Sequence, residues 1–280
     1  MHRLSASRQA LCQAALLLVG IFVLLPLWSL SRLALDGAIK SVPTAFMLWP
    51  QQPTLGVFGQ VWQRASQSLS FLGLLANSLW VSCLAAGLSV VMGASTAYAF
   101  ARLRFAGRRV GLLSLLVGAF LPPVALMTPL YLILESLHLR DSTFGLVLVY
   151  AAFSLPFCIW NMRAAFQAAP RELEEAAALD GATPLGCFLR VALPLALPAI
   201  GTAALVAFLG AYSEFAVGWL FVENGRDVTL AMAIWGMRTM GGVPWSQIAA
   251  MAILMTLPVT AVFLVLRKAL FDRMAFGSPE

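Results

Sequence analysis

Six long, largely apolar runs are the feature that most constrains the fold of this chain. A helix needs about 20 apolar residues to cross the hydrocarbon core of a bilayer, and backbone groups in lipid must find their hydrogen bonds within the segment. The runs therefore predict an all-α, polytopic membrane protein with six transmembrane helices. The predicted spans cover roughly residues 12–31, 70–99, 110–134, 143–162, 195–222 and 247–266.

The composition excludes an ordinary soluble domain. The chain is 61% hydrophobic and 11% charged, whereas soluble domains are about 45–50% apolar and about 25% charged. The cysteines fall in predicted spans or on one side of the membrane, and the two histidines are far apart in the sequence, so neither a disulfide framework nor a histidine-built metal site is expected. These residues are Cys12, Cys83, Cys158, Cys187, His2 and His138.

The distribution of basic residues predicts the orientation. With a cytoplasmic N-terminus, twelve of the 18 lysines and arginines fall on the cytoplasmic side, including the cluster "ARLRFAGRR" after the second span. Cytoplasmic loops retain such residues, so both termini are expected in the cytoplasm and the protein in the cytoplasmic (inner) membrane. The net charge of +6 then follows from topology and requires no nucleic-acid partner.

The chain shows no internal repeat and no low-complexity tract, so a single membrane domain over residues 12–280 is expected. Residues 1–11 are expected to form a cytoplasmic tail. A cleaved signal peptide is the alternative, but the first apolar run is long and no clean cleavage site follows it. Two outer loops, residues 32–69 and 223–246, are long enough to fold.

Prolines fall within several predicted spans, most densely in "PPVALMTP" of the third span. Each proline removes a helix hydrogen bond and favours a kink. Two interpretations stay open: the kinks serve packing, or they let the third and fifth spans line a passage that opens and closes.

A short acidic insert, residues 170–194, separates the fourth and fifth spans. Glu172, Glu174, Glu175 and Asp180 lie within nine positions of an otherwise apolar chain. The glutamates occupy the first turn of a predicted helix, where the helix dipole favours negative charge. Gly181 is expected to end that helix, because glycine adopts the left-handed conformation without penalty.

A second short helix is predicted to follow at once. Thr183 suits its N-cap and Pro184 its first position. An apolar stripe at helical spacing then runs to Pro194, which is expected to end the helix; its members are Leu185, Phe188, Leu189 and Ala192. Short helices are marginal alone, so the insert either folds back on this chain's own spans or docks with a cytoplasmic partner.

The insert resembles a known family. Its sequence "EAAALDGATPLGCFLRVALPLALP" is similar to the EAA loop of ABC-importer permeases, and most similar to the MalG-like half of the maltose-type carbohydrate permeases. "NSLWVS" and "AYAFARLRFAGRR" in the second span and "SEFAVGWLF" in the fifth support the resemblance, which covers about residues 70 to 272. It implies the type I ABC importer permease (MetI-like) fold.

The resemblance implies that the insert is a coupling helix, seated in a cleft of a separate ATPase subunit. In that case Glu175 pairs with a basic residue of the ATPase, Ala176 and Ala177 pack closely against it, and Gly181 sets the bend. The full set of coupling candidates is Glu175, Ala176, Ala177, Asp180, Gly181, Leu185 and Phe188.

This chain itself is not expected to be an enzyme. A P-loop places a lysine directly after a glycine, and the only lysines, Lys40 and Lys268, do not follow one. The resemblance implies that ATP and Mg²⁺ bind two copies of a partner ATPase, and that this chain binds no cofactor. The other implied partners are a second, MalF-like permease subunit, an extracytoplasmic solute-binding protein and the lipid bilayer.

Candidates for the translocation path are less specific. Glu214 is an ionisable group within an apolar run, and such groups are functional candidates by default. It either hydrogen-bonds a sugar hydroxyl or anchors the fifth span. Aromatic residues can stack on sugars but also gather at membrane interfaces. The candidates are Glu214, Ser213, Tyr212, Asn77, Tyr131 and Trp219, with Arg226, Trp235 and Met237 on a loop that faces the binding protein.

These observations predict the permease subunit of a sugar importer, for an oligosaccharide such as a maltose- or trehalose-type disaccharide. The alternatives are an ABC permease for glycerol phosphate, a polyol or a polyamine, and an ion-coupled secondary transporter that uses Glu214. The secondary transporter leaves the EAA-like insert unexplained. Two departures from the family, in the last outer loop and in the C-terminal "DRMAFGSPE", leave the choice of binding protein and a tail contact with the ATPase open.

Overall fold

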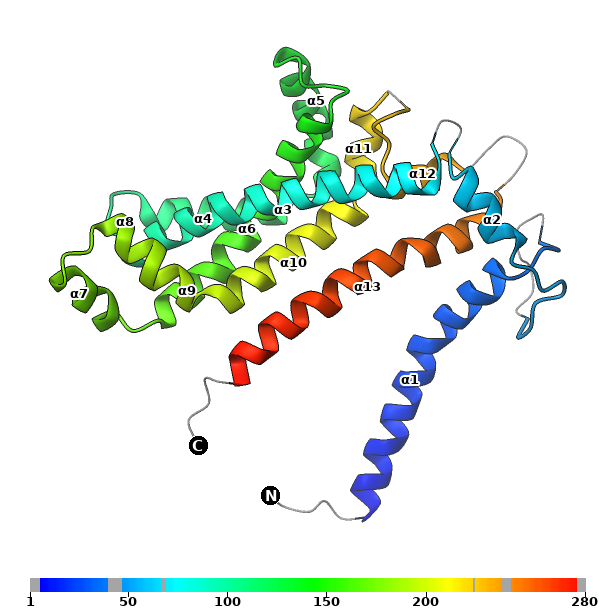
Figure 1. Cartoon of the computed structure of the whole chain (residues 1–280), viewed down its shortest axis with the longest axis horizontal. Helices are drawn as coiled ribbons and strands as arrows, with labels where there is room; N and C mark the ends of the chain where they lie inside the picture. The colour runs from blue at the N-terminus through cyan, green and yellow to red at the C-terminus, as the bar shows by residue number, and fades with distance from the viewer. Residues whose placement is uncertain (1–5, 40–46, 67–68, 224, 238–242, 276–280) are drawn as a thin grey trace. The chain divides into compact units, whose positions relative to one another are not determined.

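The computed structural model describes residues 6–39, 47–66, 69–223, 225–237 and 243–275 (Figure 1). Over these ranges the chain is helical, and its one extended pairing is an isolated bridge between Asp36 and Pro53. The prediction of an all-α fold is therefore confirmed.

Four described helices are long and apolar enough to cross a bilayer, and two bent pairs raise the number to as many as six. The four long helices are α1 (Ala6–Ala34), α3 (Phe71–Arg102), α6 (Thr143–Ala168) and α13 (Trp245–Ala275). The prediction of a six-span membrane protein is borne out in this sense, although two of the six are not straight helices.

The third predicted span, residues 110–134, bends sharply at its prolines. Helix α4 (Arg108–Phe120) stops before Pro122, and the 3₁₀ turn η1 (Pro123–Leu126) leads into α5 (Met127–Ser136). The two halves are bent by 103°. Consecutive prolines lack two helix donors, so the chain leaves the α-helix there, as the proline cluster predicts.

The fifth predicted span, residues 195–222, is wrong as a continuous helix. Helix α10 (Leu197–Ser213) ends before Glu214, which is extended (φ −73°, ψ 131°), and α11 (Ala216–Phe221) follows. No proline marks this break.

Pro194 does not end the second short helix, so that prediction is also wrong. The helix runs through α8 (Pro184–Cys187), the π-turn η2 (Phe188–Ala192) and α9 (Leu193–Leu195), and bends by 76° into α10 at Ala196. The wider π-turn directly precedes Pro194, whose ring and missing N–H disfavour a regular α-helical turn at this point.

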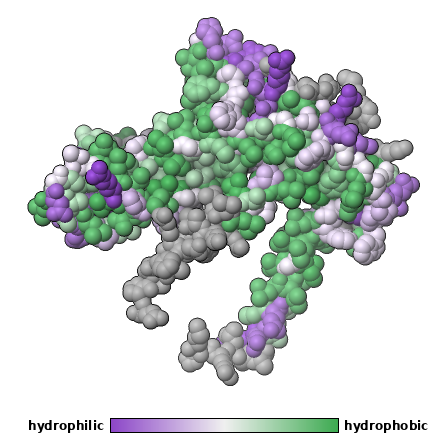
Figure 2. All heavy atoms as spheres, viewed as in Figure 1, coloured by the Kyte–Doolittle hydropathy of each residue, from purple (hydrophilic) through white to green (hydrophobic). Residues whose placement is uncertain are grey.

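The chain divides into two compact units, one within residues 1–71 and 234–257 and the other within residues 72–233 and 258–280. The single membrane domain over residues 12–280 stays a prediction. In the first unit α1 presents hydrophobic side chains to its surroundings along most of its length (Figure 2). The outer segment after it contains α2 (Gly56–Gln63), whose Val61 is buried.

Asp36 holds this outer segment together. Its carboxylate is buried and accepts the backbone N–H groups of Ala38, Gln51 and Gln52 at 2.9–3.1 Å. The Ser246 hydroxyl donates to the Asp36 carbonyl at 2.9 Å. Burial raises the pKa of Asp36, but the hydrogen bonds from Gln51, Ala38 and Gln52, together with Arg32, outweigh it and lower the pKa below its ordinary value.

The second unit is built on α3, α6 and α10. The Ser89 hydroxyl of α3 donates to the Ala151 carbonyl of α6 at 3.1 Å. Gly93 lets α3 approach α6 closely, since an added Cβ would lie 2.8 Å from Met162 and 3.0 Å from Cys158. Within this unit α8 lies at one end of the long helices and α11 at the other (Figure 1). Figure 2 shows hydrophobic surface between hydrophilic ends, as expected where lipid surrounds the helices.

We predict that Asp36→Asn destabilises the first unit. Asparagine keeps one acceptor oxygen and places an amide NH₂ against the backbone donors, so the cost is about 2 kcal/mol at neutral pH. Because the folded pKa of Asp36 is lowered, its stabilisation is present above the unfolded pKa and is lost as pH falls through the folded pKa. The thermal midpoint in detergent should therefore fall at pH 7, with the difference from wild type shrinking as the pH falls below about 4, the ordinary pKa of an aspartate. Glu135→Gln, at an exposed carboxylate, is the control; equal midpoints for both variants at pH 7 would contradict the role of Asp36.

Candidate functional site

The acidic insert forms two short helices joined by a glycine turn. Helix α7 (Glu172–Leu179) ends in two hydrogen bonds, from Ala182 N–H to the Ala177 carbonyl at 2.9 Å and from Gly181 N–H to the Ala178 carbonyl at 3.0 Å. This pair of bonds defines a Schellman cap, whose left-handed position is Gly181 with φ +88°. The predicted helix stop at Gly181 is confirmed.

The second helix begins as the sequence predicts. The Thr183 hydroxyl accepts the Gly186 N–H at 3.1 Å, and Pro184 occupies the first turn. Phe188, one of the coupling candidates, is half-buried and turns inward. Its ring centroid lies 4.8 Å from that of Tyr98 on α3 and 6.3 Å from that of Phe166 on α6.

The opposite face of the insert is open. Glu175, Ala176, Asp180 and Gly181 are exposed, and Ala177 is half-buried. Leu179 is 89% exposed and Leu185 64% exposed. Within the described part of the chain, neither Glu175 nor Asp180 forms an ion pair. This surface, comprising Glu175, Ala176, Leu179, Asp180 and Leu185, is called the insert face below.

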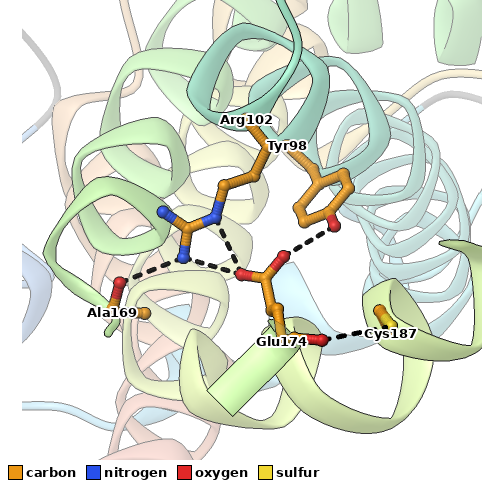
Figure 3. Close-up of polar contacts among 5 residues, drawn as sticks. All are labelled: Tyr98, Arg102, Ala169, Glu174 and Cys187. Atoms are coloured by element: carbon orange, nitrogen blue, oxygen red, sulfur yellow. Dashed lines mark hydrogen bonds and ion pairs between the residues drawn. The ribbon is translucent and has the colours of Figure 1, made fainter. Parts of the chain in front are cut away.

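Glu174 points the other way and ties α7 to the end of α3 (Figure 3). Its Oε1 accepts hydrogen bonds from Nε and Nη2 of Arg102, each at 2.7 Å, and its Oε2 accepts the Tyr98 hydroxyl at 2.8 Å. The Arg102 and Glu174 side chains are only 8% and 14% exposed. Arg102 also donates to the Ala169 carbonyl at the end of α6, at 3.0 Å.

The sequence prediction missed this cluster, although signals for it are present. Tyr98 and Arg102 are four residues apart, so they share a face in the last turns of a membrane helix. Successive helical residues point about 100° apart, so Glu174 and Glu175 cannot serve the same surface. The sequence does not show which of the two faces inward.

Glu214 lies at the break between α10 and α11 and caps the start of α11. Its carboxylate accepts the N–H groups of Val217 at 3.0 Å and Gly218 at 3.2 Å, both in the first turn of α11. A helix start leaves such donors without helix partners, and an anion is favoured there. Gly218 is itself tightly enclosed, because an added Cβ would collide with Met232 and with the Tyr150 hydroxyl.

A cavity of about 250 Å³ opens beside this break. It lies between the two broken spans and α6, and almost all of its wall is apolar. Its lining residues include Pro123 of η1, Tyr150 and Phe157 of α6, and Gly210 and Glu214 of the fifth span. The two breaks therefore meet at one place.

The other path candidates lie elsewhere in the second unit. Ser213 donates to the Leu209 carbonyl at 2.7 Å, and Tyr212 is buried with its ring stacked 5.6 Å from Phe208. The Tyr131 ring lies 5.0 Å from the guanidinium carbon of Arg140, and Trp219 is 49% exposed. Glu214 is the one path candidate among the residues that line the cavity.

Asn77 holds the loop before α12, which is predicted to be the last outer loop. Its side-chain amide donates to the carbonyls of Arg226 at 2.6 Å and Val228 at 3.0 Å, and the neighbouring Ser78 hydroxyl accepts the Leu230 N–H at 2.8 Å. These bonds fix the approach to α12 (Leu230–Gly236).

The three loop candidates are divided between the units. Arg226 is exposed in the second unit, whereas Trp235, which is 43% exposed, and the half-buried Met237 belong to the first.

The chain thus combines bent membrane helices with a short acidic two-helix insert before the fifth span. The family model described as "Binding-protein-dependent transport system inner membrane component" matches residues 89–276, and the chain belongs to this family. The expected resemblance and the expected MetI-like fold are thereby confirmed.

Several individual proteins are similar in sequence to this chain over most of its length. The trehalose transport system permease protein SugB of Mycobacterium tuberculosis is 33% identical over 74% of this chain and 77% of its own length. The maltose/maltodextrin transport system permease protein MalG of Vibrio vulnificus is 32% identical over 72% of this chain and 70% of its own length. A chain of a bacterial ABC transporter involved in the import of the acidic polysaccharide alginate has the same fold, with a TM-score of 0.75, 22% identity, and coverage of 96% of this chain and 99% of that one.

We predict that Glu214→Ala lowers the stability of the protein by about 1 kcal/mol, the usual cost of losing a helix cap. Glu214→Gln keeps an acceptor oxygen for α11 and should lose less. Thermal midpoints in detergent measure both, with Ser213→Ala as the neighbouring control, because that hydroxyl bonds only within α10 in the contacts described. A Glu214→Gln variant with an unchanged midpoint but no transport would show that the carboxylate acts on the solute instead.

Proposed function

We propose that this chain is the membrane subunit through which a sugar enters the cell, and that its insert couples passage to a separate ATPase. The observation that supports this best is Leu179, 89% exposed at the end of a helix whose inner side is fixed by Glu174. Burying a leucine side chain gains about 1.5–3 kcal/mol. A partner that covers the insert face recovers this free energy.

The chemistry of the insert face fits a basic cleft. Glu175 and Asp180 are exposed without ion pairs in the described residues, and they flank small alanines that let another backbone approach. We propose that the partner is a P-loop ATPase in two copies, that it binds ATP and Mg²⁺, and that this chain has no catalytic role and no cofactor of its own. Glu175 then pairs with a basic residue of the ATPase cleft.

The proposed coupling fixes the orientation and the other partners. The insert and the basic cluster after α3 lie on the cytoplasmic side, so both termini are cytoplasmic. A second permease subunit completes the passage. The outer loop carrying Arg226, Trp235 and Met237 meets the extracytoplasmic binding protein.

A sugar is the proposed solute because the relatives named above transport trehalose and maltose or maltodextrin. A glycosidic oligosaccharide of that size is the first choice, ahead of glycerol phosphate, other polyols and polyamines. An ion-coupled mechanism through Glu214 is less well supported, because both oxygens of that carboxylate accept backbone N–H groups of α11.

The test of this proposal is purification of the chain from native membranes in mild detergent, with the proteins recovered in stoichiometric amounts identified by mass spectrometry. Recovery of a second permease and a P-loop ATPase is the expected result, and trehalose and maltose uptake by membrane vesicles then tests the solute. Repeated recovery of the intact chain alone would overturn the proposal.

We predict that Leu179→Ser weakens recovery of the ATPase about tenfold or more, because one buried leucine accounts for at least this ratio at an interface. The stability of the isolated chain should change by no more than about 0.5 kcal/mol, since the side chain is exposed. Leu137→Ser, at a leucine that is 58% exposed between α5 and α6, is the matched control. Equal ATPase recovery from both variants would count against docking at the insert face.

We predict that replacing Gly181 uncouples ATP hydrolysis from uptake in the order Asn, Ala, Val, from mildest to most severe. No atom lies within 4 Å of an added Cβ, so the effect comes from the backbone at φ +88°, which asparagine tolerates and a β-branched residue does not. Uptake and ATPase rates of the reconstituted complex measure it, with Gly118→Val as a control at a helical glycine that also has open space. Normal uptake by Gly181→Val would refute the role of this turn.

A further inference from the structure

We infer that Glu174, Arg102 and Tyr98 form a strut that makes α7 move together with α3. This inference rests on the proposed function, in which an ATPase moves the insert. The three residues of the strut lie outside the insert face, and their inferred role is to transmit movement from α7 to α3.

The strut joins three helices at one point. Arg102 meets one Glu174 oxygen through both Nε and Nη2, each at 2.7 Å, and this charge-assisted contact holds the carboxylate against the end of α3. Tyr98 holds the second oxygen, and the Arg102 guanidinium also donates to the carbonyl of Ala169 at the end of α6. The cluster is shown in Figure 3.

Helix α7 packs against α8 and η2 of the same insert, and its described side-chain bonds to the long helices all arise at Glu174. It is eight residues long, and isolated helices of that length are marginal. Extended or turned segments flank it on both sides, with Ala169 at ψ 134° before it and Gly181 at φ +88° after it. A further contact of α7 is the weak bond from the Cys187 thiol to the Glu174 carbonyl at 3.7 Å, and it arises at the same residue. Glu174 is therefore the residue through which α7 is tied directly to α3.

Helix α3 carries the movement to the other end of the unit. It runs without a break from the strut to Asn77 and Ser78, about 37 Å away at 1.5 Å per residue. There Asn77 donates to the carbonyls of Arg226 and Val228, and Ser78 accepts the Leu230 N–H. The same helix is therefore hydrogen-bonded to the insert at one end and to the loop before α12 at the other. A displacement of α7 reaches the loop before α12 through α3.

The first experiment uses the chain alone and tests the strut itself. Hydrogen exchange at the backbone amides of α7 should be at least several-fold faster in Glu174→Gln than in Glu175→Gln, because only the first carboxylate is paired. Tyr98→Phe, which removes one hydroxyl, should give an intermediate rate. Equal exchange in the two glutamate variants would overturn the strut, whatever partners the protein has.

The second experiment uses the native complex with its ATPase. ATP, Mg²⁺ and vanadate should change hydrogen exchange at residues 226–232 in the wild-type complex. In Arg102→Gln and Glu174→Gln that change should be lost while the ATPase is still recovered, and Arg104→Gln, at an exposed arginine in the same turn region, should behave as wild type. The charge-swapped double variant Glu174→Arg with Arg102→Glu should regain part of the response.

The outcomes separate the two proposals. No ATPase recovered with the wild-type chain defeats the proposed function and leaves the first experiment to decide the strut. Loss of the ATPase from Glu174→Gln would place Glu174 in the docking surface and overturn the strut. A full exchange response at residues 226–232 in both single variants would also overturn it.

Discussion

Backbone polar groups cannot be left unpaired in a bilayer, and the rest of this structure depends on how the chain meets that constraint. A continuous helix without proline, such as α3, meets it within itself. At each break another group must take over. The carboxylate of Glu214 accepts the first donors of α11, the π-turn η2 directly precedes Pro194, and the turn after Pro122 closes with Ala125 N–H to the Pro122 carbonyl at 2.9 Å. An ionisable residue in a span is therefore not always a solute contact.

The two neighbouring glutamates of the insert have different roles. Glu174 and Glu175 point about 100° apart on α7, so they meet different surroundings. One is nearly buried in an ion pair with Arg102, and the other is exposed without an ion pair in the described residues. A buried pair adds little net stability but fixes geometry, because either partner alone would be an uncompensated charge. The inner side of the insert has to hold α7 in a fixed orientation. Its outer side has only to remain accessible to a partner.

Sequence reasoning reached the spans, the Gly181 stop and the Thr183 cap because each depends on residues close in the chain. It could not reach partners that are distant in the chain. The amide of Asn77, a path candidate, donates to the carbonyl of a residue 149 positions later. Glu214 stood out as an acid within an apolar run, and nothing in "GAYSEFAVGWL" shows that a helix ends there, since no glycine or proline marks the point. The role of Glu174 could not be predicted because the rotation of α7 about its axis is not known from the sequence. The same acidic run is compatible with either glutamate facing inward.

The surfaces that this chain leaves open explain why its sequence does not identify a solute. Within its own unit α1 exposes hydrophobic side chains, Leu179 stands almost fully exposed, and the cavity at the two breaks has an almost wholly apolar wall. A sugar site needs several hydroxyl partners, and of the polar groups at that cavity the Glu214 carboxylate is already engaged by α11. The other polar groups in its lining are the hydroxyls of Tyr150 and Ser154. What this chain supplies by itself is a set of rigid helices with two bends that meet at one cavity, and one helix, α3, whose ends are fixed to the insert and to the outer loop.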